Sequence, residues 1–382
     1  MGELVRGFEV AQGGLTWRHS WRHSGCPNLE RGWTAVEALA TLDTTRRKPR
    51  MAKTEIDPFD WGTIVDSIKD GRCVAFLGAG VNVSVEGGYR GLRLGSEVSE
   101  RLVGKLLGKD KAALDELISV VPDPAVKALL EESYGDLVKV RAHDLARVAL
   151  HIQAKPGGRN ELLKLLGELL PDGEREPSPL LKMLARLPLR MIVTTNYDRL
   201  MEKAFRDETK TDPVVVVQPT KGFDPKKQRE WEKTLAPLVP AEPCPRIVKG
   251  EHGETEPLIL YKIHGTFGDD DSGLVISEED YIEFLTVAGA DSKRGMPPLI
   301  KQMIVDSNLL FLGYSLEDWN FRALYKGLVE PLPESKRRMS FAIQYKPSEF
   351  WAGFWSRPPK SVTIYDVDLY KFADQLQEKM ES

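Results

Sequence analysis

The chain has 382 residues, of which 41% are hydrophobic and 29% are charged, and its formal net charge is −4. This composition is normal for a soluble globular protein, and the slightly negative charge gives no electrostatic support for direct nucleic-acid binding. No apolar stretch approaches the ~20 residues of a membrane-spanning helix, so we expect no membrane segment. The three isolated cysteines, Cys26, Cys73 and Cys244, argue against a disulfide framework or a cysteine zinc site and are typical of a cytoplasmic protein.

The first fifty residues differ from the rest of the chain. They contain a direct Trp-Arg-His-Ser repeat over Trp17–Ser24 and show neither a helical nor a strand period. An ordinary bacterial N-terminus begins at Met51. Residues 1–50 are therefore either a poorly structured extension that docks a partner or caps the domain, or upstream sequence included through a misplaced start codon. We favour the second interpretation.

Regular structure is expected from Trp61 onward. A short amphipathic helix over Trp61–Asp70 precedes a first buried strand over Arg72–Leu77. Five helices are then expected, over Ser96–Leu107, Lys111–Val120, Val126–Ser133, Leu137–Gln153 and Asn160–Leu170. This is more helix than one crossover between strands needs. We therefore predict a helical subdomain over residues 96–170, set over one edge of the sheet.

The second half of the chain alternates strands with helices and a long connection. Further strands are expected over Met191–Val193, Leu258–Tyr261, Leu309–Leu312, Ser340–Gln344 and Val362–Val367, with a closing helix over Tyr370–Met380. The charged, proline-punctuated segment Ala204–Glu256 is predicted to be a long excursion with one helix over Lys226–Leu235. A helix over Ser277–Val287 begins with Ser277 and Asp280, which resemble a capping box with Asp in place of Glu.

Four polar motifs follow buried strands at the points where the strands end. They are Gly78-Ala79-Gly80, Thr195-Asn196-Tyr197-Asp198, Lys262-Ile263-His264-Gly265 and Gly313-Tyr314-Ser315-Leu316-Glu317-Asp318. Continuous apolar runs are typical of parallel strands, and open α/β sheets bind ligands just beyond the carboxyl ends of such strands. The spacing therefore predicts one nucleotide site.

The glycine motif suits a phosphate group. Glycine lets the backbone come close to a pyrophosphate, and the amides of a following helix start favour an anion. A tight turn is the ordinary alternative. The third glycine of the Rossmann dinucleotide fingerprint is missing, and no acidic residue is well placed after a second strand, so a hydride-transfer site is disfavoured.

Asn196 and His264 are the strongest candidates for chemistry. Asparagine is unfavourable in buried strands, so Asn196 has no routine structural explanation, whereas Asp198 could simply cap the following helix. His264 has Gly265 beside it to make room for a ligand, and a neutral imidazole can accept a proton from a ribose hydroxyl or a water. In the last motif, Gly313-Tyr314-Ser315 can contact phosphate or adenosine ribose, whereas Asp318 suits a structural role.

As an ordered set, the four motifs resemble those of the sirtuin-like fold, and especially its divergent bacterial branch found in antiphage defence proteins. The resemblance covers most of residues 60–370. It implies a Rossmann-like parallel α/β sheet and makes residues 51–382 an NAD-binding catalytic domain. In such a site Asn196 addresses the nicotinamide and its ribose, Asp198 assists, and His264 is the general base. The residues expected to bind NAD are Gly78, Ala79, Gly80, Asn82, Thr195, Gly313, Tyr314 and Ser315.

Two departures from the protein-deacylating sirtuins bear on the reaction. The interval between His264 and Gly313 holds none of the cysteines of their zinc ribbon, and Gly87-Gly88-Tyr89-Arg90-Gly91 replaces their Pro-Asp-Phe-Arg loop. The cleft for acyl-lysine is therefore poorly supported, which leaves water as the acceptor. We expect hydrolysis of NAD to nicotinamide and ADP-ribose, without a metal.

Two other classes of function stay open. One is an NAD-dependent protein deacylase or ADP-ribosyltransferase, and the other is a non-catalytic module that senses NAD or ADP-ribose. Because an enzyme that empties the NAD pool must be restrained in the resting cell, we expect a homo-oligomer controlled by assembly. Relatives of this size are often paired with a HerA-type hexameric ATPase, which the resemblance makes the first partner to consider.

Overall fold

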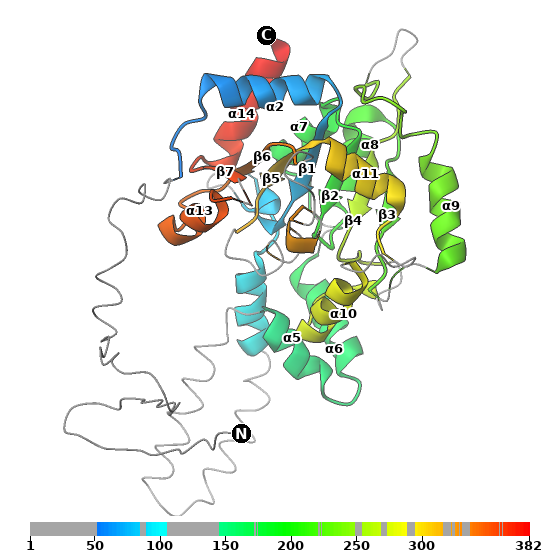
Figure 1. Cartoon of the computed structure of the whole chain (residues 1–382). Helices are drawn as coiled ribbons and strands as arrows, with labels where there is room; N and C mark the ends of the chain where they lie inside the picture. Colours follow the sequence, from blue (N-terminus) through cyan, green and yellow to red (C-terminus); the bar gives the residue numbers. More distant parts are fainter. Residues whose placement is uncertain are drawn as a thin grey trace, which may run out of the picture. The chain divides into compact units, whose positions relative to one another are not determined.

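The computed structural model describes residues 52–84, 89–104, 145–171, 175–220, 224–248, 254–268, 273–288, 295–315, 337–358 and 362–382, with a few single residues and short runs between them (Figure 1). These residues all belong to the unit Pro49–Ser382. Several sequence-based expectations lie outside the described residues: the segment 1–50, the helices over Lys111–Val120 and Val126–Ser133, the pair Gly87-Gly88, and Leu316–Asp318.

Seven parallel strands form one sheet. They are β1 (Cys73–Leu77), β2 (Met191–Thr194), β3 (Val214–Val217), β4 (Ile259–Lys262), β5 (Asn308–Leu312), β6 (Ser340–Ile343) and β7 (Val362–Tyr365). Their order across the sheet is β3-β4-β2-β1-β5-β6-β7, and every neighbouring pair is parallel. The predicted Rossmann-like parallel α/β sheet is thereby confirmed.

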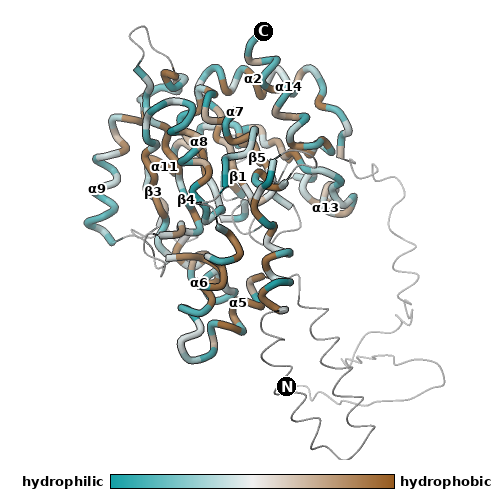
Figure 2. The backbone as a smooth tube through the Cα atoms, turned by 180° about the vertical axis from the view of Figure 1, so that it is seen from behind, coloured by the Kyte–Doolittle hydropathy of each residue, from teal (hydrophilic) through white to brown (hydrophobic). Residues whose placement is uncertain are grey.

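The sheet is covered by helices on both faces, which is why its strands are largely apolar. Successive residues of a strand point to opposite faces. In β1, Ala75 and Leu77 pack into one apolar cluster with helices α2, α7, α8 and α14, whereas Val74 and Phe76 pack into a second cluster with α10, α11 and α13. Figure 2 shows the hydrophobic residues in the strands and a largely hydrophilic α9.

The helices have the following bounds: α2 Pro58–Lys69, α5 Leu145–Gln153, α6 Gly158–Leu169, α7 Pro179–Arg186, α8 Leu200–Thr209, α9 Pro225–Leu235, α10 Glu278–Ala288, α11 Pro298–Asp306, α13 Glu349–Trp355 and α14 Leu369–Glu381. A 3₁₀ turn, η1, spans Ala79–Asn82, and residues 95–104 are also helical. Within the described ranges, no helix combines the length and the apolar character needed to cross a bilayer.

The prediction for Ala204–Glu256 was wrong in one respect. Its expected helix is present as α9, but the segment also contains β3, an edge strand that pairs with β4 alone. Pro213 and Pro219 flank this strand and made it resemble a loop. An edge strand tolerates such neighbours because one of its sides needs no hydrogen bonds. Helices α7, α11 and α13 were also not predicted from the sequence.

A third apolar cluster lies where the helical subdomain was expected. Helices α5 and α6 pack on each other, and α5 also contacts α10. Their buried side chains join residues of the helix 95–104 and two residues that follow β4: Leu102, Ile152, Leu162, Leu166, Leu274 and Ile276. Tyr197 and Phe267, which follow β2 and β4, pack against the same cluster. The cluster therefore adjoins the carboxyl-terminal edge of the sheet, the edge that carries the predicted motifs.

Candidate functional site

The segments that follow β1, β2, β4 and β5 meet at one edge of the sheet. Leu77 is in register with Thr194 on one side and with Leu312 on the other, and Thr194 is in register with Lys262. The chain moves from β1 toward β2 and β4, then returns to the opposite side of β1 for β5. This reversal of strand order is the place where open α/β sheets bind ligands.

The glycine motif after β1 packs directly against Gly313. The Gly80 amide donates to the Gly313 carbonyl over 2.9 Å, and the Gly78 amide donates to Leu312 over 2.9 Å. A Cβ atom placed on Gly80 would lie 2.8 Å from the Gly313 Cα atom, and Gly313 itself has a φ of 70°. The glycines are therefore needed for the contact between two loops. Ala79 is exposed at the tip.

Asn196 is half-buried and is held against the first motif. Its Nδ2 atom donates to the Gly78 carbonyl over 3.2 Å, and its backbone amide donates to Thr194 Oγ1 over 3.0 Å. The neighbouring Thr195 amide donates to the Leu77 carbonyl over 3.2 Å. The side-chain oxygen of Asn196 accepts no hydrogen bond from any described residue. This acceptor can therefore serve a donor such as a ribose hydroxyl.

Asp198 and Asn82 are buried and bound to each other. Asn82 Nδ2 donates to Asp198 Oδ2 over 3.0 Å, and the Leu200 amide donates to Asp198 Oδ1 over 3.0 Å. Asp198 thus accepts a hydrogen bond from the first residue of α8, although the N-cap position predicted for it is occupied by Arg199. Asn82 Oδ1 is buried and accepts no hydrogen bond within the described part of the chain. Roles of Asp198 in catalysis and of Asn82 in NAD binding stay predictions.

His264 lies in an apolar environment. Its side chain is buried, and the rings of Tyr281 and Phe284 from α10 stand edge-on to the imidazole, with centroids at 5.3 and 5.5 Å. Neither ring nitrogen bonds to another described residue. Burial lowers the pKa of His264 to about 3, because the charged imidazolium would lose its hydration. The imidazole is therefore neutral at physiological pH, as a proton acceptor must be.

Hydrogen bonds tie the loops after β2 and β4 together. The Tyr197 hydroxyl donates to the Val275 carbonyl over 2.6 Å, and the Phe267 amide donates to the Tyr197 carbonyl over 2.9 Å. The predicted capping box of α10 is confirmed, because Ser277 Oγ accepts from the Asp280 amide over 3.3 Å and Asp280 Oδ2 accepts from the Ser277 amide over 2.9 Å. These contacts fix the start of the helix that packs on His264.

The fourth motif contributes a buried ring and an exposed hydroxyl group. Tyr314 is buried and packs edge-on against Phe311, with ring centroids 6.2 Å apart, whereas Ser315 is exposed. Lys262 was not predicted as a site residue. It is completely buried and contacts Glu202 and the turn after β2. A lysine that closes an apolar strand was the signal for it, since lysine is almost never buried without a partner.

Comparison with known proteins gives a family match over the segment that holds three of the four motifs. Residues 190–357 match the family model of the SIR2-like domain. This segment is therefore similar to SIR2-like domains. The match includes Asn196, His264 and Gly313, whereas the glycine motif after β1 precedes it.

Three curated relatives, each named NAD(+) hydrolase ThsA, are similar over about half of this chain. The Enterococcus faecium protein is 28% identical over 197 residues, which are 51% of this chain and 34% of the relative. The Bacillus cereus (strain MSX-D12) protein is 27% identical over 50% of this chain and 33% of the relative. The Acinetobacter baumannii (strain 532279) protein is 27% identical over 46% and 30%, respectively. The chain thus spans about a third of the length of these relatives.

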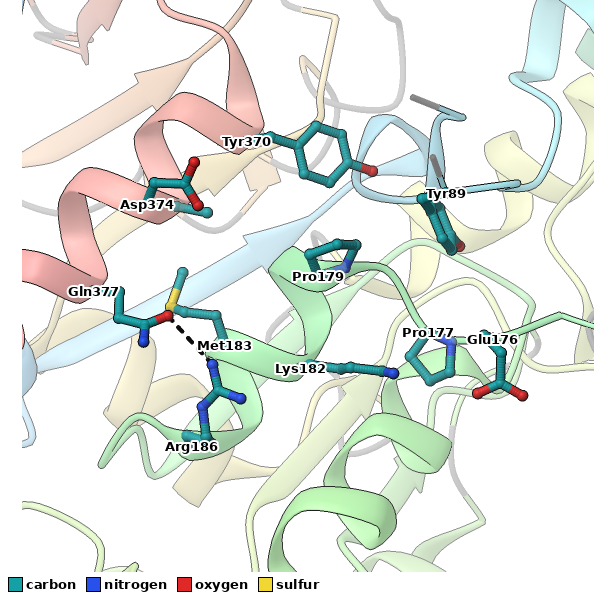
Figure 3. Close-up of a pocket in the computed structure, with 11 residues that line it drawn as sticks. Tyr89, Glu176, Pro177, Pro179, Lys182, Met183, Arg186, Tyr370, Asp374 and Gln377 are labelled. Atoms are coloured by element: carbon teal, nitrogen blue, oxygen red, sulfur yellow. Dashed lines mark hydrogen bonds between the residues drawn. The ribbon is translucent and has the colours of Figure 1, made fainter. Parts of the chain in front are cut away.

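Neither a metal-binding cluster nor the surface groove coincides with the predicted site residues in the described part of the chain. Among the described residues, no group of three or more His, Cys, Asp or Glu side chains is arranged to hold a metal ion. A groove of about 370 Å³ lies between α7 and α14, with Tyr89 at one end (Figure 3). It is lined by Tyr89, Glu176, Pro177, Pro179, Lys182, Met183, Arg186, Tyr370, Ala373, Asp374 and Gln377. None of the predicted site residues lines this groove.

Proposed function

We propose that this chain hydrolyses NAD+ to nicotinamide and ADP-ribose, and that it acts in antiphage defence by depleting NAD. The proposal rests on one observation: Asn196 and a neutral, buried His264 follow strands β2 and β4 at the carboxyl ends of the sheet, next to the place where the strand order reverses. Both residues lie in the segment that matches the SIR2-like domain. The three relatives named NAD(+) hydrolase support the same reaction.

The reaction needs the kinds of groups that this edge of the sheet supplies. Cleavage of the bond to nicotinamide builds positive charge on the ribose, and the leaving group becomes neutral as it departs. Dipoles and hydrogen-bond acceptors around the ribose therefore stabilise the transition state more than a strong acid would. The side-chain oxygen of Asn196, which accepts no hydrogen bond from the described residues, is such an acceptor.

His264 is suited to position the attacking water or a ribose hydroxyl. An imidazole whose pKa is about 3 is a weak base, but an oxocarbenium-like centre is a strong electrophile and needs little activation of its nucleophile. The apolar rings of Tyr281 and Phe284 around the imidazole keep it neutral. Water is the acceptor in this proposal, because the motifs give poor support for a site that binds acyl-lysine.

Control of the activity forms a second part of the proposal. We expect a homo-oligomer and, as the resemblance to defence proteins implies, a HerA-type ATPase as partner. Such a partner must bind the active arrangement more tightly than the resting one in order to shift the balance. Light scattering of the purified chain, alone and with the ATPase, tests this part. A monomer with full activity at micromolar concentration would contradict it.

The reaction is tested by incubating the purified chain with NAD+ and quantifying products by chromatography and mass spectrometry. We expect nicotinamide and ADP-ribose in equal amounts, with oxygen from ¹⁸O-labelled water in the ADP-ribose. A parallel incubation with an acetyl-lysine peptide distinguishes the deacylase alternative, which would yield O-acetyl-ADP-ribose. Tight NAD binding without turnover, both alone and with the partner, would instead favour a sensing module.

A further inference from the structure

Lys262 ends β4 and is completely buried, two residues before His264. Its Nζ atom donates to the backbone carbonyl of Asp198 and to Glu202 Oε1, the latter over 2.9 Å. Both partners come from the segment that follows β2, because Asp198 lies in the turn and Glu202 in the first turn of α8. One ammonium group therefore connects the strand that leads to His264 with the turn that carries Asn196.

The pair of Lys262 and Glu202 is poorly explained by stability alone. Removing an ammonium and a carboxylate from water is costly, and apolar residues of similar volume often replace a buried ion pair without loss. Glu202 Oε2 is buried and accepts no hydrogen bond from the described residues, so the carboxylate is incompletely satisfied. The retained charge is consistent with a task that an apolar pair cannot perform.

The hydrogen bonds around Asp198 indicate what this task is. Asp198 is fixed at three points: its carbonyl by Lys262, and its carboxylate by Asn82 and by the Leu200 amide. Asn196 lies two residues earlier in the same turn. The path of the backbone from Thr194 to Leu200 therefore depends on these three hydrogen bonds to Asp198. The direction of the Asn196 side chain depends on them as well.

We propose that Lys262 is a positioning residue of the NAD site. It fixes the turn that contains Asn196 relative to the end of β4, which leads to His264. Lys262 acts through the Asp198 carbonyl and touches no substrate. This inference rests on the proposed hydrolysis of NAD. Misplacing reacting groups by about 1 Å can reduce a rate by 10²-fold. Loss of the hydrogen bond from Lys262 to the Asp198 carbonyl therefore lowers kcat more than it raises the KM for NAD.

The test compares Lys262→Met with the double variant Lys262→Met/Glu202→Gln. The single variant leaves a buried carboxylate without its counter-charge, so it can fail to fold. The double variant leaves no buried unpaired charge and still lacks the bond to Asp198. We expect the double variant to fold, with kcat reduced about 10-fold or more and KM changed less than about 3-fold. Lys203→Met on α8 is the matched control, because Lys203 pairs with Glu176 away from the turn.

Hydrogen–deuterium exchange provides a readout that does not depend on activity. In the double variant we expect faster exchange over residues 195–203 and unchanged exchange in α2 and α14. If wild type does not turn over NAD, the proposed function fails, whereas the exchange data still decide the role of Lys262. A folded double variant with wild-type kcat, or with wild-type exchange over 195–203, would overturn the proposal.

Discussion

Asn82 donates a hydrogen bond to Asp198 Oδ2 over 3.0 Å, which joins the segment after β1 to the segment after β2 across 116 positions of sequence. Both side chains are buried, and the second oxygen of Asp198 accepts from the Leu200 amide. The carboxylate is thus committed to holding the loops together. The side-chain oxygen of Asn196 and the ring nitrogens of His264 form no hydrogen bond with any described residue. The chemistry is therefore expected from these two side chains, and the framework from the buried pair.

Removing either chemical group should strongly reduce turnover and leave the fold intact. We expect Asn196→Ala and His264→Ala each to reduce NAD hydrolysis by about 10²-fold or more, the usual scale for losing a polarising group or a general base. Steady-state assays of nicotinamide release measure the effect. Asn160→Ala on α6 and His151→Ala on α5 are matched controls at exposed positions. Full activity of both site variants would contradict the assignment.

Asp198 should behave differently from Asn196. Its replacement by alanine leaves the amide nitrogens of Asn82 and Leu200 without an acceptor in a buried place, so we expect a loss of about 2 kcal/mol or more in the free energy of unfolding. Urea unfolding monitored by circular dichroism measures it. Asn196→Ala, which removes one bond from a half-buried side chain, should lose less. Equal stability of Asp198→Ala and wild type would show that the carboxylate does not hold the loops.

Burial of His264 predicts a dependence of stability on pH. The pKa of His264 is lowered to about 3 in the folded protein, whereas an unfolded histidine titrates near ~6.5. Between these values the unfolded chain binds a proton that the folded protein does not. The free energy of unfolding should therefore fall as the pH drops from about 6.5 toward 3, by at most about 1.4 kcal/mol per unit, and should gain nothing from this group above pH 6.5.

Urea titrations between pH 4.5 and 7.5 test this slope. The variant His264→Asn, which has no titrating ring, should show a shallower pH dependence than wild type. For the same reason, kcat should show no loss between pH 8 and 5.5 that is due to protonation of His264. An NMR titration in which the His264 ring responds near pH 6.5 would contradict the expected neutral state.

The sequence predicted the sheet and its motifs because both depend on local patterns. Apolar runs marked β1, β2, β4 and β5, and each run ended in polar or glycine residues at the edge where the strand ends now meet. β3 was missed because an edge strand between two prolines has the composition of a loop. The capping box of α10 was found because its signal spans four residues.

The hydrogen bonds between side chains of the site could not be predicted from sequence patterns. Asn82 and Asp198 are far apart in the chain, and nothing in either motif indicates that they bond. The same holds for Lys262, whose partner Glu202 is 60 positions away. The sequence also could not distinguish two roles for Gly80. Glycine permits a close approach to a phosphate and equally a close approach to another loop, here the one at Gly313.

The contact between the first and fourth motifs gives the last prediction. Gly313 has a φ of 70°, and a Cβ atom there would lie 2.4 Å from the Val81 amide nitrogen. Gly313→Ala must therefore strain the backbone and separate the two loops. We expect it to lower the free energy of unfolding by about 2 kcal/mol or more. Because the loops carry predicted NAD contacts, we also expect the KM for NAD to rise.

A second glycine variant separates this effect from a general intolerance of substitution. Gly167 is exposed within α6, and a Cβ atom there would meet no atom within 4 Å. Gly167→Ala should leave NAD hydrolysis unchanged and should stabilise the protein by about 0.5–1 kcal/mol, because alanine has the higher helix propensity. Thermal unfolding and steady-state kinetics of both variants complete the test. If Gly313→Ala matched wild type in both measurements, the crossing of the two loops at Gly80 and Gly313 would not be needed for the site.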